Sequence, residues 1–206
     1  MRIITVSREL GSGGREVGKR LADALHMAYY DKEILTKLAE ETDLDEGYVA
    51  HMLERASAVQ SLPLTFSRTL NQPGNMFQSA QLLGREHRII RELAQQGDCV
   101  IVGRSADAVL EDMKPFKLFV YADMEAKIAR CRARAASDEN LTDREYEKRM
   151  RQVDKARAAN HDFSASYPWG DKAHYNLCLN TTGLEIKAIV PQLAGIIENW
   201  FRKNAE

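Results

Sequence analysis

The sequence predicts an α/β protein with a parallel sheet that is covered by helices on both faces. Short runs of consecutive apolar residues alternate with longer segments whose apolar residues recur every three or four positions. The first pattern is typical of strands buried on both faces, and the second of amphipathic helices. Their alternation indicates βαβ units. At 206 residues, with 44% hydrophobic and 29% charged content, the chain is expected to form one domain, 1–206.

Five short segments are expected to form the strands of the sheet. They are residues 3–6, 27–30, 99–102, 117–121 and 177–179. Helices are expected over 17–25, 34–41, 44–54, 77–95, 106–110, 125–134, 142–160 and 184–201. Pro191 is expected to kink or divide the last helix, because proline lacks the N–H of a helical hydrogen bond. Residues 58–74 have weak periodicity and two prolines, which indicates an excursion from the core.

The bulk properties of the chain limit its partners. A net charge of −1 gives no argument for binding nucleic acid or a membrane. The chain begins with a strand instead of a signal peptide and lacks an apolar run of about 20 residues. Three widely spaced cysteines, Cys99, Cys131 and Cys178, favour buried free thiols in a reducing compartment. We therefore expect a cytoplasmic protein, a monomer or homodimer, that binds a small molecule.

A glycine-rich turn joins the first predicted strand to the first predicted helix. Within residues 7–16, Gly11, Gly13 and Gly14 occupy three of four consecutive positions. Glycine tolerates positive φ and lets a ligand approach the backbone closely. The start of a helix presents unpaired N–H groups and the positive end of the helix dipole. The turn is therefore predicted to bind a phosphate group.

The turn matches the phosphate-binding pattern G-x-x-x-x-G-K-[ST] in two possible registers. A literal match starts at Gly13 and uses Gly18 and Lys19, with Arg20 in place of the hydroxyl residue. This register begins six residues after Ser7 and spends the first turn of the helix on loop.

The other register starts at Arg8, directly after the strand, and we prefer it because a phosphate loop normally leaves straight from its strand. It places Gly13 at the second glycine and Gly14 at the lysine, and Arg15 and Glu16 follow. The phosphate-binding lysine and the magnesium-binding hydroxyl are then both absent. An ordinary strand-to-helix turn without a ligand is the alternative.

Arginines provide the second signal for phosphate chemistry. Arg104 follows a buried strand and Gly103, so its guanidinium should project into the cleft at the carboxyl edge of the sheet. Residues 123–160 form a helix pair with little apolar surface, which suits a lid that closes over a bound nucleotide. This pair carries Arg130, Arg132, Arg134, Arg144, Arg149, Arg151 and Arg157. The alternatives are a solvated face of i,i+4 ion pairs for the helices and a surface ion pair for Arg104.

These residues resemble the cytidylate-kinase-like proteins within the P-loop nucleoside monophosphate kinases. The matching stretches are Ile3–Gly18, Tyr30–Glu33, Val100–Arg104, Asp154–His161, Trp169–Asp171 and Tyr175–Thr181. The resemblance implies a three-layer P-loop NTPase fold with a five-stranded parallel sheet. It also implies a core of 1–33 and 77–206, a helical insertion of the monophosphate-binding type over about 34–76, and a lid over about 123–160.

The same resemblance assigns candidate roles. Cytidylate kinases carry Gly-Lys-Gly-Thr where this chain has Gly13-Gly14-Arg15-Glu16, so the Walker A loop is degenerate. The expected cofactors are ATP, bound by Arg8, Gly11, Ser12, Gly13, Gly14, Arg15 and Glu16, and Mg²⁺, for which Glu16 is the candidate ligand. The candidate catalytic residues are Arg15, Lys19, Arg104, Arg130 and Arg157, with Arg15 or Lys19 replacing the missing cation. The candidate substrate-binding residues are Asp31, Arg104, Arg132 and Asn160.

Three functions compete. The first is an ATP-dependent phosphotransferase that acts on a nucleoside monophosphate or a related small acceptor. The second is a non-catalytic nucleotide-binding module whose bound state a partner reads, which the missing lysine favours. The third is a dinucleotide-dependent oxidoreductase: Gly11 and Gly13 begin G-x-G-x-x-G and Asp31 lies where a ribose-binding acid would fall, but Glu16 fills the third glycine. His161 is expected to be a structural histidine.

Overall fold

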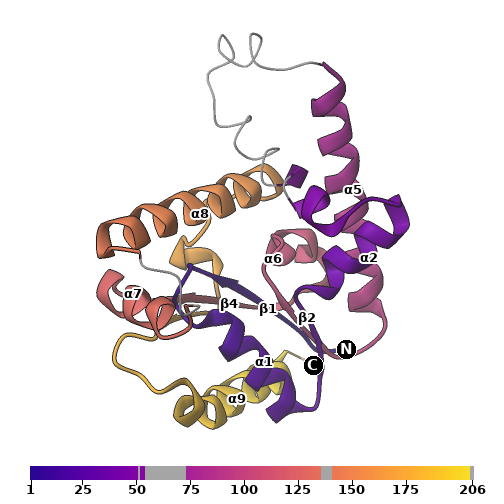
Figure 1. The fold of residues 1–206 in the computed structure, drawn as a ribbon. Coiled ribbons are helices and arrows are strands. Elements are labelled where there is room, and N and C mark those ends of the chain that lie inside the picture. The colour runs from indigo at the N-terminus through magenta and orange to yellow at the C-terminus, as the bar shows by residue number, and fades with distance from the viewer. Residues whose placement is uncertain (51, 54–72, 136–140, 205–206) are drawn as a thin grey trace.

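The computed structural model describes residues 1–50, 52–53, 73–135 and 141–204 (Figure 1). Five strands form one all-parallel sheet in the order β2-β3-β1-β4-β5. They are β1 (Ile3–Arg8), β2 (Ala28–Tyr30), β3 (Cys99–Val102), β4 (Phe116–Tyr121) and β5 (Leu177–Asn180). The predicted α/β class and five-stranded parallel sheet are confirmed.

Strand β1 lies at the centre of the sheet. Thr5 is opposite Ile101 of β3 on one side and Lys117 of β4 on the other. Its residues are mostly β-branched and buried on both faces, as a central parallel strand requires. The carboxyl ends of β3 and β4 therefore flank the loop that leaves β1, which is the place where parallel sheets bind ligands.

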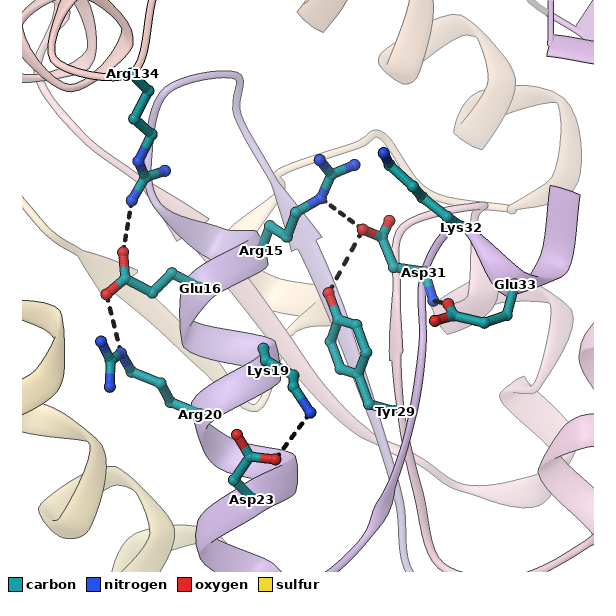
Figure 2. Close-up of a pocket in the computed structure, with 10 residues that line it drawn as sticks. All are labelled: Arg15, Glu16, Lys19, Arg20, Asp23, Tyr29, Asp31, Lys32, Glu33 and Arg134. Atoms are coloured by element: carbon teal, nitrogen blue, oxygen red, sulfur yellow. Dashed lines mark hydrogen bonds and ion pairs between the residues drawn. The ribbon is translucent and has the colours of Figure 1, made fainter. Parts of the chain in front are cut away.

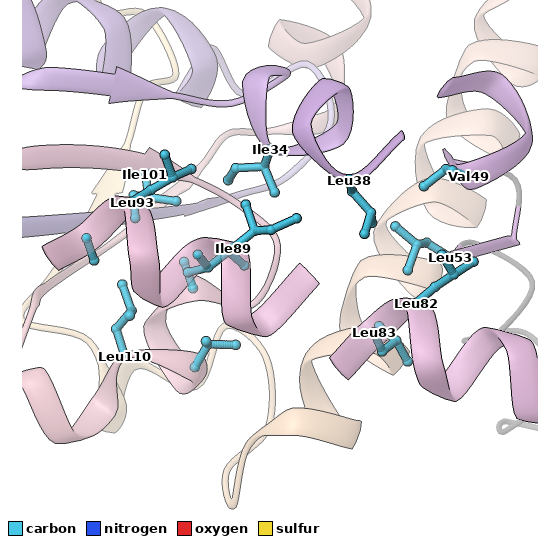
Figure 3. Close-up of a cluster of buried hydrophobic side chains, with 14 of the residues drawn as sticks. Ile34, Leu38, Val49, Leu53, Leu82, Leu83, Ile89, Leu93, Ile101 and Leu110 are labelled. Atoms are coloured by element: carbon cyan, nitrogen blue, oxygen red, sulfur yellow. The ribbon is translucent and has the colours of Figure 1, made fainter. Parts of the chain in front are cut away.

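Helices cover both faces of the sheet (Figure 1). One face packs against α1 (Gly14–Leu25) and α9 (Ile186–Lys203) through side chains that include Ile4 and Val6 of β1. The other packs against α2 (Glu33–Thr42), α5 (Pro73–Gln95) and α6 (Ala106–Val109). Figure 3 shows this second core, in which side chains of α2 and α5 approach Ile101 of β3.

Two helices with little apolar surface lie beside the carboxyl edge of the sheet. They are α7 (Met124–Arg132) and α8 (Asp143–Ser164), whose small shared core contains Ile128, Tyr146 and Met150. Helix α8 begins with a capping box, in which the Thr142 hydroxyl accepts from the Glu145 amide and the Glu145 carboxylate accepts from the Thr142 amide. Two short 3₁₀ turns, Glu111–Met113 and Lys172–His174, also occur. Residues 46–50 and 52–53 are helical, within the helix predicted over 44–54.

The end of β1 and the start of α1 differ from the predicted boundaries, and together they define the loop. Strand β1 continues to Arg8 because its pairing with β4 continues as far as Val120. Helix α1 begins at Gly14. The loop is therefore residues 9–13, and the register that starts at Gly13 would lie within a helix.

Pro191 does not divide the last helix, since α9 is continuous through it, and a kink there stays a prediction. Proline is tolerated because Ile186, Val190 and Leu193 still bury the helix against the sheet. The described residues contain free cysteines, of which Cys99 alone is buried. None of the helices in the described ranges is long and apolar enough to cross a membrane. The excursion expected over 58–74 lies outside the described residues as far as 72, and 73–74 begin α5.

Candidate active site

The loop between β1 and α1 presents free backbone donors. The amide of Glu9 donates to the carbonyl of Val120 at 3.0 Å, and that of Leu10 to the carboxylate of Asp154 at 2.7 Å. Among the described residues, no protein group accepts a hydrogen bond from four other amides at the helix start, those of Gly11, Gly13, Arg15 and Glu16. Gly13 precedes the helix at φ +83°, a conformation that favours glycine. The loop is therefore shaped to bind an anion.

Arg130 and Thr181 hold the carbonyl side of this loop. The Arg130 guanidinium donates to the carbonyl of Ser12 at 3.4 Å and to the hydroxyl of Thr181 at 3.0 Å, and it also contacts the Thr181 carbonyl. The Thr181 hydroxyl in turn donates to the Ser12 carbonyl at 2.7 Å. The candidate lid arginine Arg130 thus contacts the loop itself through its carbonyl groups.

A cavity of about 310 Å³ opens between this loop and helices α7 and α8; we call it the loop cavity. Gly11, Gly13 and Gly14 line it from one side. Arg130, Arg134 and Arg149 line it from the other, and Ser12 is buried beneath it. The combination of free amides and guanidinium groups suits a polyphosphate.

A second cavity, of about 440 Å³, lies above the ends of β1 and β3; we call it the sheet cavity. Its apolar wall comes from Leu53 and Leu83, and its polar lining includes Ser7, Glu86, Arg104, Asn160, His161 and Trp169. The structure therefore brings two of the candidate substrate residues, Arg104 and Asn160, into one cavity.

Three arginines line both cavities: Arg8 from the end of β1, Arg15 from the first turn of α1, and Arg157 from α8. The Arg15 Nε is 2.5 Å from one carboxylate oxygen of Asp31, and the Arg8 Nη2 is 3.9 Å from the other. Arg157 donates to the carbonyl of Arg8 at 2.9 Å. The border between the two cavities is therefore made of guanidinium groups around one carboxylate.

Positive charge is in excess at this border, where three arginines surround one carboxylate. Burial and, to a smaller extent, the charges of Arg157, Arg104 and Arg15 together lower the pKa of Arg8 to about 9, while Asp31 opposes the shift. Burial likewise lowers the pKa of Arg157, with a contribution from Arg15. A bound anion would relieve both the desolvation and the mutual repulsion of these cations.

Arg104 lines the sheet cavity and also makes an ion pair. It lies in the left-handed region at φ +60°, and its Nη1 is 3.2 Å from Oε1 of Glu86 in α5. Glu86 is 4% exposed, and burial raises the pKa of its carboxyl, which Arg104 opposes. The ion pair is with a buried carboxylate and not at the surface, and the binding of a phosphate by Arg104 stays a prediction. Glu86 could have been noticed because it falls on the apolar face of its helix.

Figure 2 shows a third hollow, a groove of about 610 Å³ along α1 and the end of β2. Lys19 lines this groove and neither of the other two cavities. Its ammonium pairs with Asp23 at 2.9 Å and lies 5.5 Å from the centre of the Tyr29 ring. The structure therefore separates the two candidate cations: Arg15 is at the cavity border, and Lys19 is one helical turn away from it.

The carboxylate of Glu16, the candidate magnesium ligand, is held by two arginines (Figure 2). Arg20 is 2.9 Å from one oxygen and Arg134 is 2.6 Å from the other. Both oxygens are therefore occupied in this arrangement. The described residues contain no group of three or more His, Cys, Asp or Glu side chains that could hold a metal ion.

Arg132, another candidate substrate residue, lies away from both cavities. It pairs with Asp143 and lies 5.6 Å from the centre of the Tyr146 ring. Its position follows from the helix period, because residues two apart on α7 point in nearly opposite directions and Arg130 faces the loop.

His161 borders the sheet cavity as part of a buried polar network that the sequence did not reveal. Its Nε2 is 2.9 Å from Asp107 of α6, whose other carboxylate oxygen accepts from the Ser7 hydroxyl at 3.2 Å. Tyr167 donates to the same carboxylate at 3.4 Å. These contacts tie the end of β1 to α6 and α8, and the structural role of His161 stays a prediction.

The all-parallel sheet, whose central strand leads through a glycine-rich loop into α1, and the family match below define the class: the chain is a kinase-like protein of the P-loop fold. The cytidylate kinase-like family matches residues 3–183, and the chain belongs to that family. A cytidylate kinase from Chlamydia caviae is 25% identical over 151 residues, which cover 62% of this chain and 69% of that protein.

Solved structures agree with the fold. An uncharacterized protein from Eubacterium ventriosum superposes with a TM-score of 0.68 at 23% identity, covering 96% of this chain and 99% of that one. Shikimate kinase from Bacteroides thetaiotaomicron superposes with a TM-score of 0.57 at 14% identity, covering 96% and 98%.

Proposed function

We propose that the protein transfers the γ-phosphoryl group of ATP to a nucleoside monophosphate or a related small anionic acceptor. One observation carries this proposal: Arg8, Arg15 and Arg157 line both the loop cavity and the sheet cavity. A phosphoryl group passing from one cavity to the other would move among these three guanidiniums. Phosphoryl transfer asks a protein mainly to position two substrates and to neutralise charge on the moving group.

ATP would bind in the loop cavity. The free amides of Gly11, Gly13, Arg15 and Glu16 would contact its phosphates, and Arg134, just beyond the end of α7, would lie across them. Mg²⁺ would enter with ATP and neutralise charge on the phosphate oxygens. We propose that residues 123–160 act as the lid, since they close this cavity with arginines and share little core with the sheet.

The acceptor would bind in the sheet cavity. Arg104 would hold its phosphate with two parallel hydrogen bonds, and Asn160 would contact its polar groups. Asp31 would keep Arg8 and Arg15 oriented toward the border between the cavities. The helical insertion over about 34–76 would complete this side, as Leu53 already lines it.

The test is monophosphate-dependent release of ADP from Mg·ATP across a panel of nucleoside monophosphates. Arg157→Gln should lower kcat/KM by about tenfold or more, which is the loss of at least one hydrogen bond to a charged group. Arg151→Gln is the matched control, because Arg151 lies on the same helix, is 70% exposed and pairs only locally with Glu147 among described residues. Equal activity of both variants would contradict the placement of the reaction at this border.

A second function, a non-catalytic nucleotide-binding module, is favoured by Glu16, whose oxygens are held by Arg20 and Arg134, and by the missing lysine at Gly14. The same experiment separates the two functions. Tight binding of Mg·ATP without ADP release, with every monophosphate of the panel, would support the module and contradict the kinase.

A further inference from the structure

The side chain of Arg8 lies in a slot that two glycines leave open. A Cβ atom added to Gly14 would be 2.4 Å from the Cβ of Arg8. A Cβ atom added to Gly103 would be 1.7 Å from the Nη1 of Arg8. Both distances are far below ordinary van der Waals contact. The stem of Arg8 therefore excludes a side chain at the start of α1, and its guanidinium excludes one at the end of β3.

Positions 8 and 14 correspond to two defined positions of the phosphate-binding pattern. In the register that starts at Arg8, the pattern has glycine at Arg8 and lysine at Gly14. The two residue types are exchanged in this chain: the large cation is at the first position and glycine is at the seventh. The 2.4 Å approach explains why the exchange involves both positions, since a lysine at 14 would collide with the arginine at 8.

The guanidinium of Arg8 is poorly satisfied by the protein. Its side chain is 15% exposed, and it donates no hydrogen bond to any described residue. Asp31 is its nearest carboxylate at 3.9 Å, and Arg15 binds that carboxylate more closely, at 2.5 Å. A buried guanidinium with free N–H groups is costly unless an acceptor completes it. Arg8 lines both cavities, so its free donors face the space where the phosphates would lie.

We propose that Arg8 supplies, from the end of β1, the phosphate-directed cation that the loop pattern places at position 14, and that Arg8 and Gly14 form one coupled exchange. This inference rests on the proposed function, because it assumes that ATP phosphates occupy the loop cavity. It differs from the sequence hypotheses, in which Arg15 or Lys19 replaced the lysine. An arginine has a planar fork that can bind two phosphate oxygens at once, which a lysine cannot do.

The test is a set of exchange variants, with the affinity for Mg·ATP measured by calorimetry and stability by thermal unfolding. Arg8→Met keeps the length of the side chain and removes its charge, and it should weaken Mg·ATP by about tenfold or more without loss of the fold. Gly14→Lys alone should lower the melting temperature and weaken binding. Arg8→Gly with Gly14→Lys should recover the affinity to within about twofold of wild type, because the effects of two changes in direct contact are coupled and do not add.

The matched control is Gly195→Lys, which adds the same side chain to a helical glycine with nothing within 4 Å of its Cβ, and it should change neither property. Wild-type protein that fails to bind Mg·ATP would overturn the proposed function and this inference together. Normal binding by wild type and by folded Arg8→Met would overturn this inference alone. So would a folded double variant that binds as weakly as Arg8→Met, or a Gly14→Lys variant with unchanged stability and affinity.

Discussion

Replacing Arg104 by alanine should lower the free energy of unfolding, because it leaves the buried carboxylate of Glu86 without its ion-pair partner. Glu86 is 4% exposed, and among the described residues it accepts a hydrogen bond from Arg104 at 3.2 Å. Burial raises the pKa of Glu86, and the charge and hydrogen bond of Arg104 lower it. Without Arg104 the pKa should rise further, because only the desolvation remains. The variant should therefore lose stability in a pH-dependent way.

The size of the loss follows from the burial of the pair. Removing one partner of a fully buried ion pair costs about 3–5 kcal/mol, and a hydrogen bond to a charged group contributes about 1.5–3 kcal/mol. Arg104 is 25% exposed, and Glu86 can escape by protonation, so we expect about 2 kcal/mol at pH 7.5. For a chain of this size that corresponds to a decrease in melting temperature of about 4–8 °C.

The sign of the pH effect is fixed by the direction of the shift. A carboxyl whose folded pKa is raised above its ordinary value of 4.5 favours the folded state below that value, and the advantage is lost as the pH rises through the folded pKa. Removing Arg104 should thus cost little at pH 4.5 and most at pH 7.5.

The assay is thermal unfolding of wild type, Arg104→Ala and the double variant Arg104→Ala with Glu86→Gln at both pH values. The double variant should be more stable than the single variant at pH 7.5, because it has no charge to bury. An Arg104→Ala loss of equal size at pH 4.5 and 7.5, or no recovery in the double variant, would refute this reasoning.

Two further variants test the border and the network behind it. Arg15→Ala should weaken Mg·ATP more than Lys19→Ala, because Arg15 lines both cavities and Lys19 lines neither; the opposite order by calorimetry would revive the register that starts at Gly13. Asp107→Asn should destabilise the fold by about 2–3 kcal/mol at pH 7. Burial alone would raise the pKa of Asp107, but its hydrogen bond to His161 and the charge of that residue lower the pKa below 3.8. A carboxyl with a lowered folded pKa stabilises the fold only while it is ionised. In thermal unfolding, the stability difference between wild type and Asp107→Asn should therefore disappear as the pH falls through the lowered pKa.

Much of the fold could be predicted because its strands carry a strong local signal. Runs such as Cys99–Val102 are short, rich in β-branched residues and apolar at every position, which is typical of a strand buried on both faces. The end of β1 could not be predicted in this way. Arg8 is charged, and it belongs to the strand because it is opposite Val120 of β4, a contact that the local pattern does not contain.

The candidate site was predictable where a residue follows directly from a strand end. Arg104 and Gly103 reach the sheet cavity for that reason. The sequence could not show which arginine of α7 faces the loop, because that depends on the rotation of the helix about its axis. It also could not show that Arg8 fills the space beside Gly14 and Gly103. Gly103 is far from Arg8 along the chain, and the contact with Gly14 depends on how the loop folds α1 back over the end of β1.

The central claim is that phosphoryl transfer occurs at the border lined by Arg8, Arg15 and Arg157. The most direct measurement is a crystal structure with Mg²⁺, a non-hydrolysable ATP analogue and a nucleoside monophosphate. We predict the γ-phosphate within about 3 Å of at least two of these guanidiniums, a hydrogen-bond distance, with the acceptor phosphate beside Arg104. A nucleotide whose phosphates lie instead in the groove beside Lys19 and Tyr29 would contradict the claim.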